Sequence, residues 1–194
     1  MPKVHGSLPI VWDDALGPAY AAGAGAAAPS YTVDFIAETG GNANELRLPT
    51  FSETTNDRVY FTVQFPHDLY IPASGNITLR PHVHWTFNAE PTDGETVVWE
   101  LNYVIAAANA TFAATVSVLT ATAYTTTAAA EIRKHIITSL GDITMSAADA
   151  GPSMVLVGNL KLDSSSTIAA SLVGLLSFDV HYQKCPIGTD TEFA

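Results

Sequence analysis

The sequence predicts an all-β protein, a two-sheet antiparallel β-sandwich of jelly-roll type with an extended N-terminal arm. Apolar and polar residues alternate with period two along most of the chain after Asp57, as in strands that bury one face. Turn-forming residues separate these stretches at intervals typical of sandwiches, and no internal repeat suggests a propeller or a solenoid. A chain of 194 residues is long enough for one well-buried core, so one domain with appendages is expected.

The chain is expected to divide into three parts. Residues 1–56 form the extended arm and the first strand pieces, because they are rich in alanine, glycine and turn formers and have no clean period. One strand piece is expected at Tyr31–Ile36. The alanine run at Ala21–Ala28 leaves a short helix open, although its two glycines disfavour one. Residues 57–184 form the sandwich domain, and residues 185–194 form a C-terminal tail.

The first two long strands of the domain are expected at residues 58–65 and 77–87. In the first, the residues expected to face the core are Val59, Phe61, Val63 and Phe65. In the second, the core-facing residues are Leu79, Val83, Trp85 and Phe87. The opposite face of that strand carries Arg80, His82, His84 and Thr86.

A third strand is expected at residues 96–108, where the apolar residues in step are Val97, Trp99, Leu101, Tyr103 and Ile105. Asp93 and Gly94 precede it and favour a tight turn. Both this strand and the preceding one carry aromatic-rich apolar rows, which favour cross-strand pairing. We therefore expect the two strands to form a hairpin.

The middle of the chain is dominated by alanine, threonine and valine, and a strand is expected at residues 115–122. Residues 131–140 satisfy both a strand pattern and a helical spacing. The strand is the favoured interpretation, and the helix stays open.

Two further strands complete the predicted domain. In residues 154–162, the residues expected to face the core are Met154, Leu156, Leu160 and Leu162. In residues 172–183, the expected core face consists of Leu176, Phe178, Val180 and Tyr182. The opposite face consists of Ser177, Asp179, His181 and Gln183.

The composition indicates an assembling protein that does not bind nucleic acid. Only 14% of the residues are charged, whereas a soluble domain has about a quarter. Such a chain is expected to cover much of its surface with partner subunits, as a homo-oligomer. The 19 acidic residues outnumber 8 scattered basic residues, so no stripe exists to neutralise phosphates.

The cellular setting is expected to be a cytoplasm, with no membrane partner. No stretch of about 18 apolar residues is present, and the N-terminus lacks the apolar core of a signal peptide. The single cysteine, Cys185, excludes a disulfide framework within the chain.

The histidines pose the main functional question. His82 and His84 share one face of a strand, and His181 shares a face with Asp179 on the last strand. Imidazoles and a carboxylate can ligate a metal ion, as in a cupin-type enzyme, where Glu90 would supply the carboxylate. Glu90 lies in a proline-flanked loop, however, and the glycine and proline spacing of cupins is missing. We therefore expect no metal, no cofactor and no catalytic residue.

The favoured interpretation is a polar sheet face or a subunit interface. Trp12 is expected to anchor the arm onto a neighbouring subunit. Trp85 and Trp99 follow the apolar phase, so they are expected in the core rather than on a sugar-binding surface. The candidate subunit-contact residues are Trp12, His82, His84, Asp179 and His181.

Five segments resemble a family of tailed-bacteriophage proteins of similar size, and they occur in the family's order: RVYFTVQFPHDLY, LRPHVHW, VVWELNYVIA, SFDVHYQ and GTDTEF. The similarity covers roughly residues 12–193. It implies a virion structural component and brings no catalytic residues with it. The alanine-rich N-terminal part and the Ala/Thr-rich central strands depart from the family pattern.

Together, the resemblance, the low charge and the arm lead to one expected function. The protein is expected to be a capsid decoration or cement protein, a homotrimer that binds the major capsid protein on the outer surface of a phage head. Its acidic charge suits a virion exterior. The alternatives are a tail, collar or fibre-associated component with a receptor-binding role and, more remotely, a cupin-like metalloenzyme at His82, His84 and His181.

Overall fold

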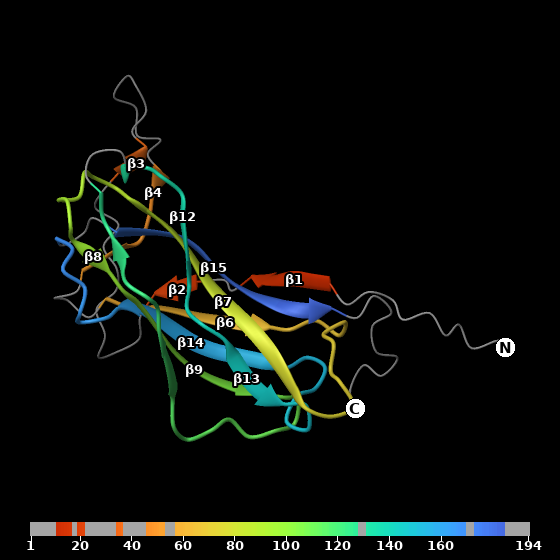
Figure 1. The fold of residues 1–194 in the computed structure, drawn as a ribbon. Helices are drawn as coiled ribbons and strands as arrows, with labels where there is room; N and C mark the ends of the chain where they lie inside the picture. Colours follow the sequence, from red (N-terminus) through yellow and green to blue (C-terminus); the bar gives the residue numbers. More distant parts are fainter. Residues whose placement is uncertain are drawn as a thin grey trace.

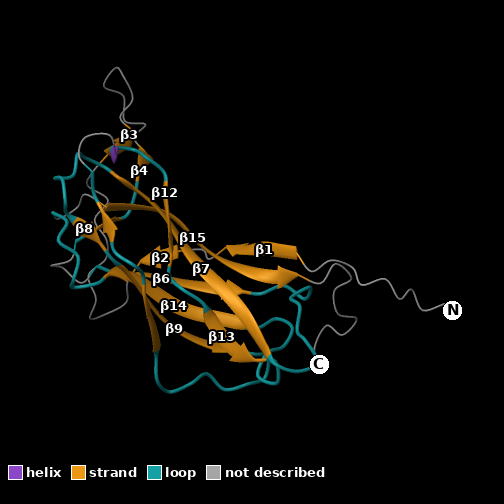
Figure 2. Ribbon diagram, viewed as in Figure 1, coloured by secondary structure: helices purple, strands orange, loops and turns teal. Residues whose placement is uncertain are grey.

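The computed structural model describes residues 11–16, 19–21, 34–36, 46–52, 57–127, 131–169 and 173–184. These residues form strands, turns and loops, with a 3₁₀ residue at Glu131, and none of them lies in an α-helix, which confirms the predicted all-β class (Figures 1 and 2). The strands are β1 (Val11–Leu16), β2 (Ala19–Ala21), β3 (Asp34–Ile36), β4 (Leu46–Arg47), β5 (Thr50–Phe51), β6 (Val59–Gln64), β7 (Asn76–Phe87), β8 (Thr96–Val97), β9 (Trp99–Ala106), β10 (Ser117–Thr120), β11 (Tyr124–Thr125), β12 (Ile136–Ser139), β13 (Ile143–Ser146), β14 (Val155–Leu162) and β15 (Val173–Lys184).

Two antiparallel sheets make up most of the fold. The first sheet has the order β1-β15-β7-β12, with β13 also paired to β7 and β5 to β15. The second sheet has the order β10-β9-β14-β6-β2. Two small two-stranded sheets, β11-β8 and β3-β4, complete the described pairing.

The core lies between the two main sheets and is rich in aromatic rings. Phe61 of the second sheet meets Phe178 of the first at a ring separation of 4.1 Å, and Phe65 meets Tyr182 at 6.1 Å. The sheets therefore pack face to face, as expected for a sandwich. The predicted core-facing residues of β6, β7 and β14 are all buried.

The predicted hairpin between residues 77–87 and 96–108 is wrong. β7 belongs to the first sheet and β9 to the second, so the loop between them crosses from one sheet to the other. Trp85 and Trp99 face each other across the core, with ring centroids 6.3 Å apart. Two strands that bury the same core from opposite sides show the same alternation as two paired strands, so the pattern did not distinguish these arrangements. The tight turn at Asp93 and Gly94 is confirmed, and Gly94 has a φ of 81°.

The placement of Leu176 on the core face is also wrong. The pairing of β15 with β7 shifts between Leu175 and Ser177, as in a β-bulge. The extra residue changes the phase, so Leu175 is 3% exposed and Leu176 is 38% exposed. Phe178, Val180 and Tyr182 are buried as predicted.

Each of the two central segments predicted to be a strand contains one. The strand interpretation of residues 131–140 is confirmed for their second half, which contains β12, whereas residues 131–135 are not a strand; residues 115–122 contain β10. The segment predicted to be an arm with strand pieces supplies β1 and β2, which are edge strands of the first and second sheets. Residues 22–30 and 185–194, with Cys185, lie outside the described part of the chain.

Gly158 is a core-facing position of β14 that has no room for a side chain. A Cβ atom there would lie 2.7 Å from the carbonyl oxygen of Asn102 and 2.9 Å from the ring of Phe61. Since Phe61 already packs against Phe178, the ring has little space to move. We expect Gly158→Ala to lower the free energy of unfolding by about 1–3 kcal/mol.

Chemical denaturation measures this effect, and Gly151→Ala is a matched control. The added methyl group at Gly151 would meet only the Cβ of Ala107, at 3.3 Å. Equal unfolding free energies for the two variants would show that Gly158 is not needed for close packing.

Two tyrosines, half-buried Tyr124 and buried Tyr182, have pKa values above the ordinary value of tyrosine. Burial, followed by the hydrogen bond to Glu131, raises the pKa of Tyr124 to about 12. Burial, followed by the charge of Asp68, raises the pKa of Tyr182 to about 12. The folded state thus holds these protons more tightly than the unfolded state, whose tyrosines ionise near pH 10.

The two tyrosines predict a loss of stability at alkaline pH. Their contribution is fully present below about pH 10 and falls as the pH rises toward about 12. Denaturation at a series of pH values measures the change, and tyrosinate absorbance follows the ionisation. Tyr124→Phe should reduce the pH dependence; an unchanged profile in that variant would contradict the assignment.

Candidate functional site

A polar cluster lies on the outer face of the first sheet, where β1, β15 and β7 run side by side (Figure 1). Paired residues in antiparallel strands point to the same face. The register pairs Asp179 with His82, and it pairs His181 with both Arg80 and Asp14. The alternation predicted this face for the β7 and β15 residues, and the structure confirms it.

Asp179 is the centre of the cluster and is almost fully buried, with 8% of its side chain exposed. Its Oδ2 atom lies 2.7 Å from His84 Nε2. The Nδ1 atom of His84 in turn lies 2.8 Å from Nε2 of His135, and the two rings stack at 5.0 Å. One oxygen of the carboxylate is therefore held by a chain of two imidazoles.

The other oxygen of Asp179 has no hydrogen-bond partner. Its Oδ1 atom lies 3.8 Å from His82 Nδ1 and 4.0 Å from His181 Nε2, both beyond hydrogen-bond distance. His181 Nε2 instead lies 2.7 Å from Oδ1 of Asp14. The rings of His82 and His181 are 4.2 Å apart, so three polar groups surround one small space.

The pKa of the His82 imidazole lies below its ordinary value. Burial, and next the nearby His181, lower the pKa of His82, while the charge of Asp179 opposes them. A histidine with a lowered pKa is neutral near pH 7, because its ordinary pKa is about 6.5. A neutral imidazole has one nitrogen that accepts a hydrogen bond or binds a metal ion, while the other donates its N–H.

The structure brings the five predicted contact residues onto one sheet. Trp12 lies at its edge, 41% exposed, and the guanidinium of Arg80 lies 4.4 Å from the centre of its ring. His181 is partly accessible, whereas His82 and His84 are largely covered and Asp179 is buried. Trp85 and Trp99 are fully buried, as predicted.

The ligand set considered for a cupin-like site is not assembled. Glu90 lies in the exposed loop after β7, and it is not part of the described cluster that could hold a metal ion. That cluster consists of His82, Asp179 and His181. Asp179 therefore occupies the position for which the sequence offered Glu90.

Two members of the site were missed from the sequence. Asp14 comes from β1, within the segment predicted to be an arm, and His135 was not among the candidate residues. His135 comes just before β12, whose Ile137 pairs with His84. Extending the alternation of β12 back to residue 135 would have placed His135 on this face, but no signal identified β7 as the partner strand.

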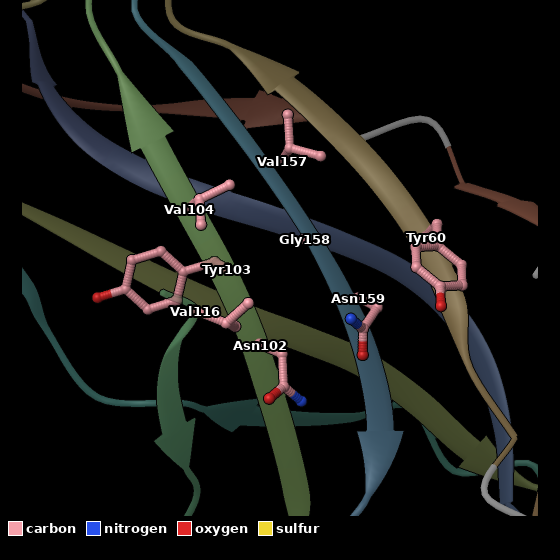
Figure 3. A pocket seen from close by; sticks show the side chains of 8 residues that line it. All are labelled: Tyr60, Asn102, Tyr103, Val104, Val116, Val157, Gly158 and Asn159. Atoms are coloured by element: carbon pink, nitrogen blue, oxygen red, sulfur yellow. The ribbon is translucent and has the colours of Figure 1, made fainter. Parts of the chain in front are cut away.

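A second candidate surface lies on the outer face of the second sheet. A shallow hollow of about 160 Å³ lies there, lined mostly by apolar atoms from β6, β9, β14 and the segment before β10. Figure 3 shows the side chains that line it. Its lining residues include Val104, Val116 and Val157. Exposed Val116 and Val118 extend this apolar surface to the sheet edge.

Within the described ranges, no helix is long and apolar enough to cross a membrane. Comparison of the chain with protein-family models, with curated proteins and with solved structures gave no match.

Proposed function

We propose that the protein is a structural component of a tailed-bacteriophage virion, a decoration or cement protein on the outside of the head. The observation that carries the proposal is the set of five sequence segments that resemble tailed-phage proteins, and the strand order is compatible with it. Eight strands of the main sheets can be counted from one to eight in chain order: β1, β6, β7, β9, β10, β12, β14 and β15. Counted in this way, they have the order 1-8-3-6 in the first sheet and 5-4-7-2 in the second. This order supports a jelly roll, an architecture used by viral capsid domains, lectins and cupins.

The fold alone does not select among those functions, since one fold hosts many. The five sequence segments that resemble tailed-phage proteins favour the virion. Four of them fall on β6, β7, β9 and β15, so the resemblance lies in the strands of the sandwich. The net charge of −11 suits the exterior of a head rather than its DNA-filled interior.

The surface supports contacts with other subunits. Large apolar side chains are exposed at several positions of the described chain: Trp12, Phe112, Val116, Val118, Ile132, Ile137 and Leu176. Such side chains mark interaction surfaces where they gather, as Val116 and Val118 do beside the hollow. We propose that the protein forms a homotrimer that binds the major capsid protein and adds apolar contact area between capsid subunits.

The test of the proposal is the position of the protein in a reconstructed virion. Copies distributed over the capsid lattice would support a cement protein. Copies confined to the vertex that carries the tail would instead support the alternative, a tail, collar or fibre-associated component. Absence from purified virions would overturn both.

The apolar edge of the second sheet gives a further prediction. We expect Val116→Asp combined with Val118→Asp to weaken self-association or capsid binding, because each substitution places a charge in a contact that excludes water. Both residues are more than half exposed, so folding should be preserved. Sedimentation and capsid co-pelleting measure the two kinds of association.

Thr144→Asp, at an exposed position of β13 in the first sheet, is the matched control. If the double variant associates as well as this control, the edge of the second sheet is not a contact surface.

A further inference from the structure

We propose that His82, Asp179 and His181 form a binding site for a divalent transition-metal ion of the Zn²⁺ type, which links β7 to β15. One ligand atom from each residue lies within 4.8 Å of the other two. The inference does not depend on the virion function. It concerns a structural ion on the sheet face and assigns no reaction to it.

The spacing of the three groups fits an ion better than direct contact. Asp179 Oδ1 is 3.8 Å from His82 Nδ1 and 4.0 Å from His181 Nε2. Zinc binds nitrogen and oxygen at about 2.0–2.2 Å, so two ligand atoms of a tetrahedral site lie about 3.4 Å apart. Contraction by about half an ångström brings Asp179 Oδ1 to that distance from each of the two imidazole nitrogens.

Two of the ligand atoms lack partners although they are buried. Neither Asp179 Oδ1 nor His82 Nδ1 has a hydrogen-bond partner. The Asp179 side chain is 8% exposed. A buried carboxylate oxygen without a partner is costly, because it has lost the water that would solvate its charge. An ion between the two atoms would satisfy both at once.

Neighbouring residues already orient the site. His84 holds Oδ2 of Asp179 at 2.7 Å, so Oδ1 is directed toward His82 and His181. This is the outer-shell arrangement found around metal-binding carboxylates. Asp14 lies 2.7 Å from His181 Nε2, on the exposed side of the cluster, and is placed to supply a fourth ligand from β1.

The donor set indicates the class of ion. Two imidazoles and one or two carboxylates suit Zn²⁺ and its neighbours Co²⁺ and Ni²⁺. Ca²⁺ and Mg²⁺ prefer all-oxygen sites. Such an ion would join β7, β15 and β1, and so brace the half of the first sheet that includes its β1 edge.

Zinc titration of the chelator-treated full-length chain tests the proposal by calorimetry. We expect one Zn²⁺ per chain and a rise in the melting temperature, with neither effect from Mg²⁺. Asp179→Asn and His82→Gln should each weaken binding by at least about 100-fold. His84→Gln, which removes an outer-shell partner, should cost about 10–100-fold.

His67→Gln is the matched control, because His67 lies beside Ser153 and is not part of the cluster of proposed ligands. Its affinity should equal that of the parent chain. Melting in the presence of chelator shows whether each variant is folded, and the visible spectrum of the Co²⁺ form reports tetrahedral coordination independently of the variants. Absence of stoichiometric binding, or full affinity in Asp179→Asn, would overturn the proposal. So would a high-resolution structure of the zinc-treated protein that holds only water between these residues.

Discussion

Trp85→Ala is expected to lower the free energy of unfolding by about 3–5 kcal/mol, the largest effect of any single substitution considered. Trp85 is fully buried and lies at the centre of an aromatic cluster. Its ring contacts Phe87 at 5.0 Å, Tyr124 at 5.2 Å and Trp99 at 6.3 Å. Alanine leaves a large cavity between the two sheets and also leaves Thr138 without the indole N–H, now 2.9 Å away.

Urea denaturation followed by circular dichroism measures this loss, with Trp12→Ala as the matched control. Trp12 lies in the same sheet but is exposed, and its described ring contact is with Arg80. The control should cost no more than about 1 kcal/mol. If the two variants were equally stable, Trp85 would not be a core residue.

Glu131→Ala is expected to lower the free energy of unfolding by about 3 kcal/mol, through the loss of partly buried hydrogen bonds to a carboxylate. Glu131 is buried, with 3% of the residue exposed. Its carboxylate accepts hydrogen bonds from the Tyr124 hydroxyl at 2.5 Å and the Thr127 hydroxyl at 3.2 Å, and Lys134 lies 3.8 Å away. Removing the carboxylate leaves the half-buried Tyr124 hydroxyl without its acceptor.

The same denaturation measurement applies, and Glu90→Ala removes a carboxylate from an exposed loop as the control. A surface change of that kind is expected to stay within about 0.5 kcal/mol. Glu131→Gln should retain part of the stability, because an amide oxygen still accepts from Tyr124. A Glu131→Ala cost as small as that of Glu90→Ala would show that the hydrogen bonds add no net stability.

The strands and their buried faces could be predicted because each depends on its own alternation. Val59, Phe61 and Val63 need no knowledge of a partner strand to be placed on one face. The bulge at Leu176 left no such signal, since an extra residue in β15 is defined only by its pairing with β7. Sheet membership was missed for a related reason: Trp85 and Trp99 follow the same pattern whether they lie side by side or face to face.

The candidate site could likewise be predicted only where it depends on alternation within one strand. Alternation placed His82 and His84 on one face, and Asp179 and His181 on another strand's polar face. Their convergence depends on the register that sets Asp179 opposite His82, which no local pattern encodes. Asp14 could not be predicted as a member of the site, because its strand, β1, pairs with β15, which lies at the opposite end of the described chain. The virion function and the subunit contacts stay predictions.

The position of β15 has a consequence for synthesis. β15 follows every other described strand in the sequence, yet it lies between β1 and β7 in the first sheet. The ion pair between Lys184 and Asp13 joins residues 171 positions apart. The chain must therefore leave the ribosome beyond residue 184 before β1 can pair with β15. We expect the first sheet to form only after β15 has been translated. We also expect it to form slowly, as in other folds with distant pairings.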